Sequence, residues 1–267
     1  MLTRGFGPAR SRQFWVNALA RLAEHPALPG LPRHGYMLES GQVPVGVILL
    51  IFTAIDDGGG PRIQCNVSSW YVEPEFRMFG TMLISHALKH KHVTYFNVTP
   101  APHTLAILQA QSYRQFCRGR VVAAPAMSLG GRGVRVEAVA AGVAAARNLP
   151  EFEASLLQSH AGYGCISLIC HVGGESYPFV FAPRRKFGVV AFAFLIYCRA
   201  LDSFVRFSGP LGRFLLRHGL PLVILDANGP VRGLVGRYYN ANPKYFRGPR
   251  QPRLGDLSYS ERAMFGV

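Results

Sequence analysis

The stretch VEPEFRMFGTMLISHAL, residues 72–88, carries the most information about the fold. A strand-like run ends at Val72 and an amphipathic helix begins near Phe79, so the segment PEFRMFG connects the two. We expect its backbone amides to be unpaired by either element and to lie at the positive end of the helix, where anions bind. Gly80 leaves room for a phosphate to approach the backbone, and Arg77 adds a positive charge beside it. The stretch therefore predicts a site for a pyrophosphate group.

The elements on both sides of this stretch alternate between strands and helices. The spacing of apolar residues predicts a helix over residues 11–25, a hairpin over 35–56 with a turn at 40–42, and a third strand over 63–72. After the quoted helix we expect a strand over 93–100, a helix over 103–116 and a short strand over 121–126. This order predicts a layered α/β (α+β) domain with a mixed, mostly antiparallel central sheet flanked by helices.

The second part of the chain repeats the same order. An Ala-rich segment, about 138–158, predicts a helix interrupted at Pro150, and a hairpin across Gly173-Gly174 follows. A strand over 187–198, a helix over 204–219 and a strand over 220–230 complete this part. We place the boundary in the glycine-rich stretch 126–136 and predict two similar halves, 1–130 and 131–267.

The composition is that of a folded protein. Apolar residues make up 49% of the 267 residues and charged residues 16%. The longest apolar runs, 45–52 and 189–198, are far shorter than the roughly 20 residues of a membrane-spanning helix. Residues 1–22 lack the apolar core of a secretory signal, so we place the protein in the cytoplasm. The five cysteines are widely spaced without a CxxC pair, which indicates buried free thiols.

The chain carries a large excess of positive charge. Its 29 Lys and Arg against 14 Asp and Glu give a net charge of +15, which would attract nucleic acid, anionic membrane or phosphorylated ligands. The densest clusters are residues 184–186 and 244–253. No DNA-binding motif accompanies them, so the charge alone does not predict a nucleic-acid partner.

The R-x-x-G sequence from Arg77 to Gly80, after the strand-like VEPEF, resembles the acetyl-CoA motif Q/R-x-x-G-x-G/A of the GNAT superfamily of N-acyltransferases. The predicted order of elements is similar too. The resemblance implies that acetyl-CoA or another acyl-CoA is the acyl donor and that the next strand diverges near Asn97, leaving a V-shaped gap for the thioester. It implies two groups of binding residues: Trp70, Tyr71 and Val72 for the pantetheine arm, and Arg77, Met78, Phe79, Gly80, Thr81 and Met82 for the pyrophosphate.

The sequence also departs from the GNAT pattern. Met78 and Met82 stand where smaller residues are common, so the cradle is bulkier than the motif expects. Leu108 stands where a Tyr often acts as general acid, a role that water or Tyr113 could take. The short opening strand of such domains is missing ahead of the first helix. In the second half no R-x-x-G follows the strand that ends at Cys198, so we expect no CoA site there.

Candidate catalytic residues have structural alternatives. Glu73 lies at the end of the third strand and could act as base, but an acidic residue there also favours the helix dipole. His103 follows Pro102 and could act as base near neutral pH, or cap a helix. His86, His90 and His92 have a spacing that could bind zinc, yet no acidic or Cys partner is nearby, so we predict no metal.

Together these features predict an enzyme that moves an acyl group, most simply acetyl, from acyl-CoA to an amine of a small molecule or protein by direct attack. The acceptor would lie in a cleft between the halves, where residues 226–229 and 255–261 could line the pocket. The alternative is a non-enzymatic basic module with a degenerate CoA site that binds nucleic acid or an acidic partner. Met78 and Met82 favour that alternative.

Overall fold

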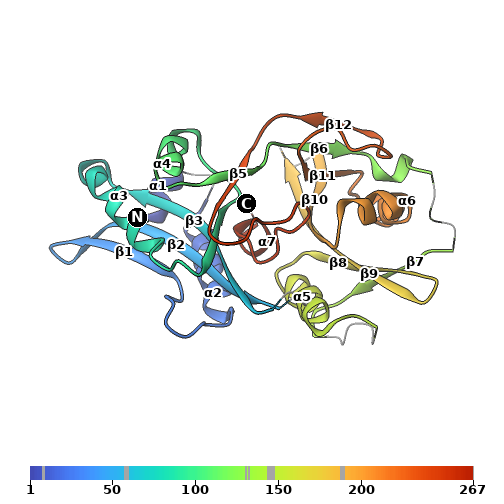
Figure 1. Cartoon of the computed structure of the whole chain (residues 1–267), viewed down its shortest axis with the longest axis horizontal. Coiled ribbons are helices and arrows are strands. Elements are labelled where there is room, and N and C mark those ends of the chain that lie inside the picture. The colour runs from blue at the N-terminus through green and yellow to red at the C-terminus, as the bar shows by residue number, and fades with distance from the viewer. Residues whose placement is uncertain are drawn as a thin grey trace.

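The computed structural model describes residues 1–7, 10–56, 60–129, 131, 133–142, 148–186 and 190–266. They form two α/β halves that lie side by side, each built on one mixed sheet, with the C-terminal end of the chain between them (Figure 1). The predicted fold class, a mostly antiparallel sheet flanked by helices in each of two similar halves, is confirmed.

The first sheet has six strands, of which β3 and β4 are parallel neighbours. Across the sheet the strands are β1 (Gly35–Ser40), β2 (Val43–Ile55), β3 (Arg62–Val72), β4 (Val93–Asn97), β13 (Lys244–Arg247) and β5 (Arg114–Cys117). The connection from β3 to β4 consists of the 3-10 helix η1 (Pro74–Phe79) and the helix α3 (Gly80–Ala87). The 3-10 helix η2 (Pro102–Thr104) and the helix α4 (Leu105–Ala110) follow β4.

The second sheet has seven strands and the same pattern of directions. Across the sheet they are β12 (Gly236–Tyr239), β6 (Gly119–Ala123), β11 (Leu222–Ala227), β10 (Val190–Cys198), β9 (Glu175–Lys186), β8 (Ile166–Val172) and β7 (Arg135–Val139). Here β10 and β11 are the parallel pair, and the helix α6 (Leu201–Arg217) connects them as α3 connects β3 and β4. The helix α5 (Glu151–Gly162) precedes β8.

The two halves exchange strands. Strand β5 belongs to the first sheet, but β6, which begins two residues later, pairs with β11 and β12 of the second sheet. Strand β12 belongs to the second sheet, but β13 pairs with β4 and β5 of the first. Each half therefore completes the sheet of the other. Strands β6 and β13 each pair with strands on the other side of the predicted division at residue 130. The division into two domains stays a prediction.

A buried ion pair fixes the exchanged strand β13. Lys244 on β13 places Nζ 2.6 Å from Oδ1 of Asp226 on β11, and both side chains are almost fully buried. The pair joins a strand of the first sheet to a strand of the second. Breaking such a pair is costly, because one charge is left without a partner in a medium that solvates it poorly.

The apolar run of residues 45–52 forms a strand that is buried on both faces. Side chains alternate along a strand, so Val47, Leu49 and Ile51 point into a core shared with the second half, and Ile48 and Leu50 point toward α3. The shared core includes side chains of α2 (Arg12–Glu24), α5 and the C-terminal helix α7 (Glu261–Met264). A continuous apolar strand is typical of a sheet covered on both faces.

The predicted helix at residues 11–25 is confirmed as α2. Ser11 caps it by accepting a hydrogen bond from the amide of Phe14 at 3.2 Å, and Trp15, Ala18 and Leu22 form its buried face. A short helix, α1 (Leu2–Phe6), precedes it. All five cysteines are free and buried, as predicted.

Two predicted helices were too long. The helix expected over residues 103–116 ends at Ala110, because Ser112 adopts a left-handed conformation (φ 59°), and β5 begins at Arg114. Of the helix expected over 138–158, Val139 is the last residue of β7 and α5 begins only at Glu151. Residues 143–147 of that prediction lie outside the described part of the chain.

Helix α6 contains the glycine-bearing sequence 208–212, which lies within the helix predicted over residues 204–219. Pro210 lies inside this helix, and Gly212 lets the 3-10 helix η3 (Pro125–Met127) pack closely: a Cβ at Gly212 would be 2.1 Å from the amide nitrogen of Ala126. At 17 residues, α6 is also amphipathic rather than apolar all round. Within the described ranges, we find no helix with the length and apolarity needed to cross a membrane.

Candidate functional site

Strands β3 and β4 separate partway along the first sheet. Their ladder ends at the pair Asn66 and Phe96, one residue before Asn97, near which the GNAT resemblance implies a divergence. The side chain of Asn66 closes the ladder by donating from Nδ2 to the carbonyl of Phe96 at 3.1 Å. On its other side β4 pairs with β13, and that ladder extends to Asn97, which pairs with Tyr245.

Strand β3 carries a bulge just beyond the divergence. Between β2 and β3, Val47 pairs with Tyr71 but Leu49 pairs with Ser68, so β3 contains one extra residue. Ser69 takes the unusual conformation that this requires, with φ 47°. On the side facing β4, the described chain supplies no ladder partner for β3 from Ser68 to Val72. This part of β3 is an open strand edge with a bulge at its start.

The equivalent strand of the second half has the same bulge but a closed edge. Leu195 pairs with Phe181 and Tyr197 with Val180, so β10 holds an extra residue at Ile196. The C-terminal segment pairs with β10 there: the amide of Cys198 donates to Gly255 at 2.9 Å, and the amide of Leu257 donates to Ile196 at 2.7 Å. In the second half, the backbone of residues 255–257 thus occupies the edge position that is open in the first half.

The connection after β3 differs from the sequence prediction. We expected an open loop with unpaired amides, and this was wrong, because residues 74–79 form the 3-10 helix η1, which continues directly into α3. The amide of Phe76 bonds to the carbonyl of Glu73 and that of Gly80 to Arg77, so these donors are used within the turn. Arg77 and Thr81 are exposed at the surface of this turn.

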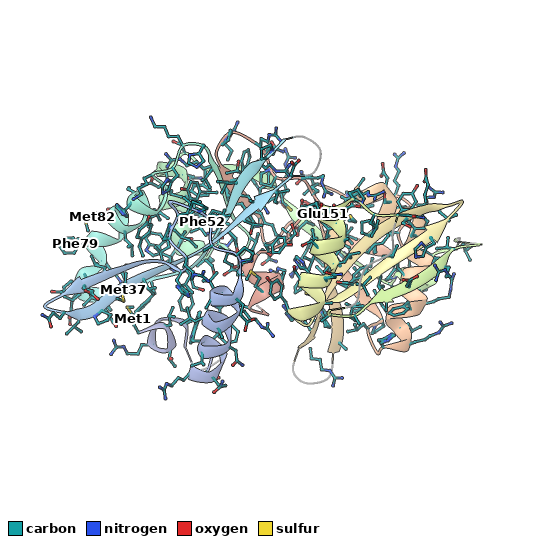
Figure 2. The ribbon with its side chains drawn as sticks, turned by 90° about the horizontal axis from the view of Figure 1, so that it is seen from below. Met1, Met37, Phe52, Phe79, Met82 and Glu151 are labelled. Atoms are coloured by element: carbon teal, nitrogen blue, oxygen red, sulfur yellow. The ribbon has the colours of Figure 1, made fainter. Side chains whose placement is uncertain are left out.

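The apolar residues of the turn also point outward. Met78 is 76% exposed and Met82 55%. Figure 2 shows Phe79 and Met82 at the end of the first half that points away from the second. Gly80 is buried, and a Cβ at this position would be 3.3 Å from the ring of Trp70. The absence of a side chain at Gly80 therefore lets α3 pack closely on that ring. The role of Arg77 to Met82 in holding a pyrophosphate stays a prediction.

The three predicted catalytic residues lie in different surroundings. Glu73 is bound on both oxygens, by Arg4 at 2.7 Å and by the hydroxyl of Tyr71 at 2.8 Å. His103 is exposed in η2. Tyr113 is buried in the core under α3 and α4, where desolvation raises the pKa of its hydroxyl well above the usual value. No contact between any two of them occurs in the described structure, and their catalytic roles stay predictions.

Sequence reasoning missed a carboxylate at the divergence of the strands. Glu261, the first residue of α7, is buried, and its two oxygens accept hydrogen bonds from the hydroxyls of Ser68 and Thr99. Its amide donates to Oδ1 of Asn66 at 2.6 Å. Two signals pointed this way: residues 255–261 were a predicted pocket segment, and β3 carries polar residues on one face of a buried strand.

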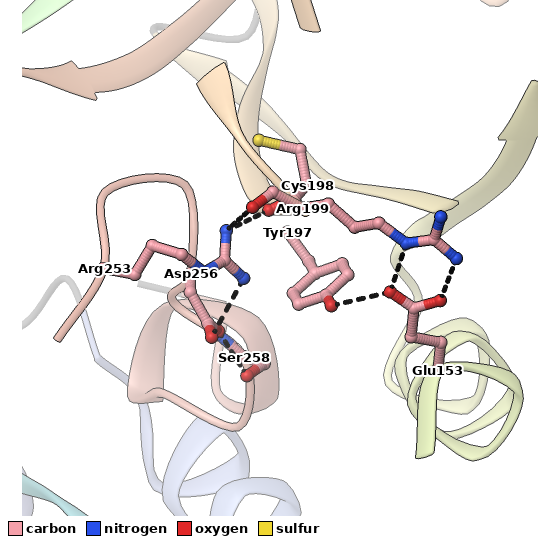
Figure 3. A network of polar contacts seen from close by, with 7 residues as sticks. All are labelled: Glu153, Tyr197, Cys198, Arg199, Arg253, Asp256 and Ser258. Carbon is pink, nitrogen blue, oxygen red and sulfur yellow. Dashed lines mark hydrogen bonds and ion pairs between the residues drawn. The ribbon is translucent and has the colours of Figure 1, made fainter. Parts of the chain in front are cut away.

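A cleft of about 890 Å³ lies between the halves. An ion-paired network forms part of its wall (Figure 3). Arg199, directly after β10, binds Glu153 on α5 through two bonds of 2.7 and 2.5 Å, and the hydroxyl of Tyr197 on β10 donates to Glu153 at 3.1 Å. Burial raises the pKa of Tyr197, so its hydroxyl stays protonated. Further lining residues are His25, Leu28, Thr53, Asp56, Glu151, Phe152, Ser155, Ser159, Tyr163, Arg253 and Tyr259.

The cleft has a neutral histidine at its border. His25 hydrogen-bonds through Nε2 to the carbonyl of Phe52 at 2.8 Å, and burial lowers its pKa. Elsewhere, His86 packs edge-on against the ring of Tyr36 rather than in a histidine cluster. Among the residues that the structure describes, no group of three or more His, Cys, Asp or Glu side chains could hold a metal ion.

Solved structures with this architecture include N-acetyltransferases. A GCN5-related N-acetyltransferase from Anabaena variabilis has a TM-score of 0.58, with 92% of this chain and 68% of that chain covered and 13% of the residues identical. A GCN5-related N-acetyltransferase from Kribbella flavida has a TM-score of 0.56, with 92% and 66% covered and 17% identical. This chain has the fold of the GCN5-related N-acetyltransferases. No protein-family model matches this sequence, and no curated protein matches it.

The GNAT-like fold occurs here in tandem. Each half contains two antiparallel pairs followed by a parallel pair with a helix between its strands, and each has a bulge in the third strand of this series. The second sheet also has β7 ahead of α5, whereas β1 is the outermost strand of the first sheet. The predicted tandem GNAT-like arrangement is therefore confirmed as a fold.

Proposed function

We propose that the protein is an acyltransferase that moves an acyl group, most simply acetyl, from acyl-CoA to an amine. One observation carries the proposal: among the residues that the structure describes, the strand edge beyond the divergence has no ladder partner in the first of the two similar GNAT-like halves but has one in the second. In the second half residues 255–257 fill this edge. An open edge offers backbone donors and acceptors to an extended ligand, as in strand addition.

Two features of the first half fit the pantetheine arm of acyl-CoA, which carries amide groups. The edge from Ser68 to Val72 can exchange hydrogen bonds with those amides. The indole Nε1 of Trp70 is buried and has no hydrogen-bond partner in the described chain, so it is a donor that a ligand could satisfy. When bound, acyl-CoA supplies the activated acyl group. Trp70, Tyr71 and Val72 would then hold its arm.

The pyrophosphate fits less closely than the sequence predicts. Because η1 uses its amides internally, the phosphates would rely on the exposed guanidinium of Arg77 and on the amides that remain at the surface of the turn. A charged side chain at an exposed site contributes modestly and is screened by salt. We therefore expect affinity for acyl-CoA to fall as the salt concentration rises.

The cleft between the halves is our proposed acceptor site. Its wall contains the carboxylates of Asp56 and Glu151, besides that of Glu153, which is paired with Arg199, in a chain whose net charge is +15. Its two guanidinium groups have partners already: Arg199 binds Glu153, and Arg253 binds backbone carbonyls and Asp256. Carboxylates and aromatic rings favour a cationic amine. The amine would be part of a small molecule or a protein side chain.

A thermal-shift titration with acetyl-CoA and octanoyl-CoA tests the proposal. A ligand at about 100 times its Kd stabilises the folded state by about 2.7 kcal/mol, which corresponds to a rise in Tm of roughly 5 to 8 °C. We expect Arg77→Ala to weaken binding about three- to tenfold. Arg217→Ala, which removes the same charge from the exposed end of α6, should leave binding unchanged. No shift at millimolar ligand would contradict the proposal.

The alternative, a basic binding module, is favoured by one observation. In η1 the amides expected to hold phosphate are used within the turn, as a degenerate CoA site would require. Such a module would bind nucleic acid with an affinity that falls steeply with salt. Gel-shift titrations of a mixed-sequence duplex at two salt concentrations separate the two functions. Tight, salt-sensitive binding without an acyl-CoA shift would favour the module.

A further inference from the structure

Glu261 brings a carboxylate from the C-terminal end of the chain to the place where β3 and β4 separate. One oxygen accepts from Ser68, on β3 just before the bulge, and the other accepts from Thr99, two residues after β4 ends. The carboxylate thus bridges the two diverging strands. The amide of Glu261 is held by Asn66, the residue that closes the ladder between them.

This carboxylate is buried, and its partners are neutral. Glu261 is 2% exposed, and none of the ion pairs among the described residues includes it. The neighbouring charge is Arg262, whose guanidinium packs over the ring of Phe194 at 3.9 Å. The hydroxyls of Ser68 and Thr99 donate to the carboxylate without pairing it with a cation.

The other candidate bases are less well placed. Both oxygens of Glu73 are already bound, by the guanidinium of Arg4 and by the hydroxyl of Tyr71. His103 lies at the surface in η2. Glu261 differs from both because it lies at the divergence itself. Thr99 is exposed and its hydroxyl donates to the buried carboxylate, so Thr99 lies between Glu261 and the protein surface.

We propose that Glu261 is the proton acceptor for the incoming amine, with Ser68 and Thr99 as positioning residues. The inference rests on the proposed acyltransferase function. In the transfer, the amine nitrogen forms a bond to the acyl carbon, and the carbon–sulfur bond of the thioester breaks. The nitrogen gives its proton to Glu261, by way of the Thr99 hydroxyl. The electron pair of the broken bond leaves with sulfur as a thiolate, which takes up the proton and restores the carboxylate.

The test compares binding and turnover in Glu261→Gln, Glu261→Asp and Thr99→Val. Binding is measured as the thermal shift with acetyl-CoA, and turnover as release of free thiol in the presence of a panel of primary amines such as benzylamine, tyramine and putrescine. Glu261→Gln should keep the thermal shift and lower turnover about 100-fold or more, the typical contribution of a general base. Glu261→Asp should recover part of the loss. Glu175→Gln, on the exposed turn of the second half, should change neither quantity.

The pH dependence of turnover distinguishes a chemical from a structural role. Turnover of Glu261→Gln relative to the unchanged protein should recover as the pH rises, because hydroxide can take the proton that the carboxylate no longer accepts. Turnover of Glu261→Gln within about threefold of the unchanged protein, or an unchanged pH profile, would overturn the inference.

If Glu261→Gln fails to fold or to bind acetyl-CoA, Thr99→Val decides, because it removes only an exposed hydroxyl. A roughly tenfold lower turnover with normal binding supports the inference, and unchanged turnover overturns it. If the unchanged protein binds acetyl-CoA and releases thiol, and Glu261→Gln does so at the same rate, the inference fails while the proposed function stands. If the unchanged protein shows no acetyl-CoA binding and no thiol release, both fail.

Discussion

At the residue scale, His160 on α5 is buried against the C-terminal segment, and both of its ring nitrogens have hydrogen-bond partners. Nδ1 bonds to the carbonyl of Leu156 at 2.8 Å, and Nε2 accepts from the amide of Tyr259 at 3.1 Å. Burial lowers the pKa of His160 to about 4. The imidazole is therefore neutral near pH 7, and its protonation opposes folding.

Because the pKa of His160 is lowered in the folded state, we predict that the protein loses stability in mild acid. Because the folded pKa lies below the unfolded value, the unfolded chain takes up the proton first. The contribution of neutral His160 to the free energy of unfolding is fully present above about pH 6.5 and is lost as the pH falls toward 4. The loss amounts to about 2 kcal/mol at pH 5. His25, whose pKa is also lowered, acts in the same direction. Urea unfolding between pH 5 and 7.5 measures the effect.

The control for this prediction is His160→Gln. It removes the titrating group, so its free energy of unfolding should depend less on pH than that of the unchanged protein, even if it is less stable at pH 7. The same slope in both proteins would show that His160 does not carry the effect.

Gly80 shows what a single residue can and cannot predict. The sequence places a glycine after Arg77 and before a helix, which fits a phosphate cradle. The structure shows a nearer reason for the glycine, since the ring of Trp70 lies where its Cβ would begin to crowd. Both explanations need a small residue at the same position. Only the positions of the surrounding side chains, which the spacing of residues does not reveal, tell them apart.

At the element scale, the strands were predicted better than their connections. Periods of two and of 3.6 residues identified β2, β3, α2, α6 and β11, because burial imposes those periods over many residues. Short connections have no such period. PEFRMFG therefore looked like an open loop but forms η1, and residues 103–116 divide into η2, α4 and β5. Glu261 was missed as a site residue because the contact spans 193 residues.

The ion pair of Lys244 and Asp226 predicts that the exchanged strand is sensitive to loss of one charge. Lys244→Met leaves the buried carboxylate of Asp226 without its cation and should cost about 3 to 5 kcal/mol of unfolding free energy. The double variant Lys244→Met with Asp226→Asn should recover most of the loss. Urea denaturation of the single and double variants measures the coupling. A single variant that costs less than about 1 kcal/mol would contradict the account.

At the scale of the whole molecule, the exchange of strands joins two similar halves into one folding unit. The sequence indicated two halves from the repeated order of elements, and the two sheets confirm them. It could not indicate the exchange, because residues 114–116 were assigned to the end of a helix and the apolar pattern of the following strand does not reveal which sheet that strand joins. The pairing of β6 and β13 depends on contacts between distant parts of the chain.

The exchange predicts that residues 1–130 do not fold alone. This fragment lacks β13, which lies between β4 and β5, and it contains β6, whose partners β11 and β12 are absent. We expect circular dichroism and NMR of the fragment to show no cooperative unfolding, while the full chain unfolds in a single transition. A fragment with dispersed amide signals and its own melting transition would contradict this.

The central claim, that acyl-CoA pairs with the open edge of β3, is tested most directly by hydrogen exchange with and without acetyl-CoA. We predict slower exchange of the amides from Ser69 to Val72 when acetyl-CoA is bound. Exchange at Tyr197 to Arg199, where residues 255–257 close the equivalent edge, should not change. Unchanged exchange at Ser69 to Val72 under saturating acetyl-CoA, or equal protection of both edges, would contradict the account.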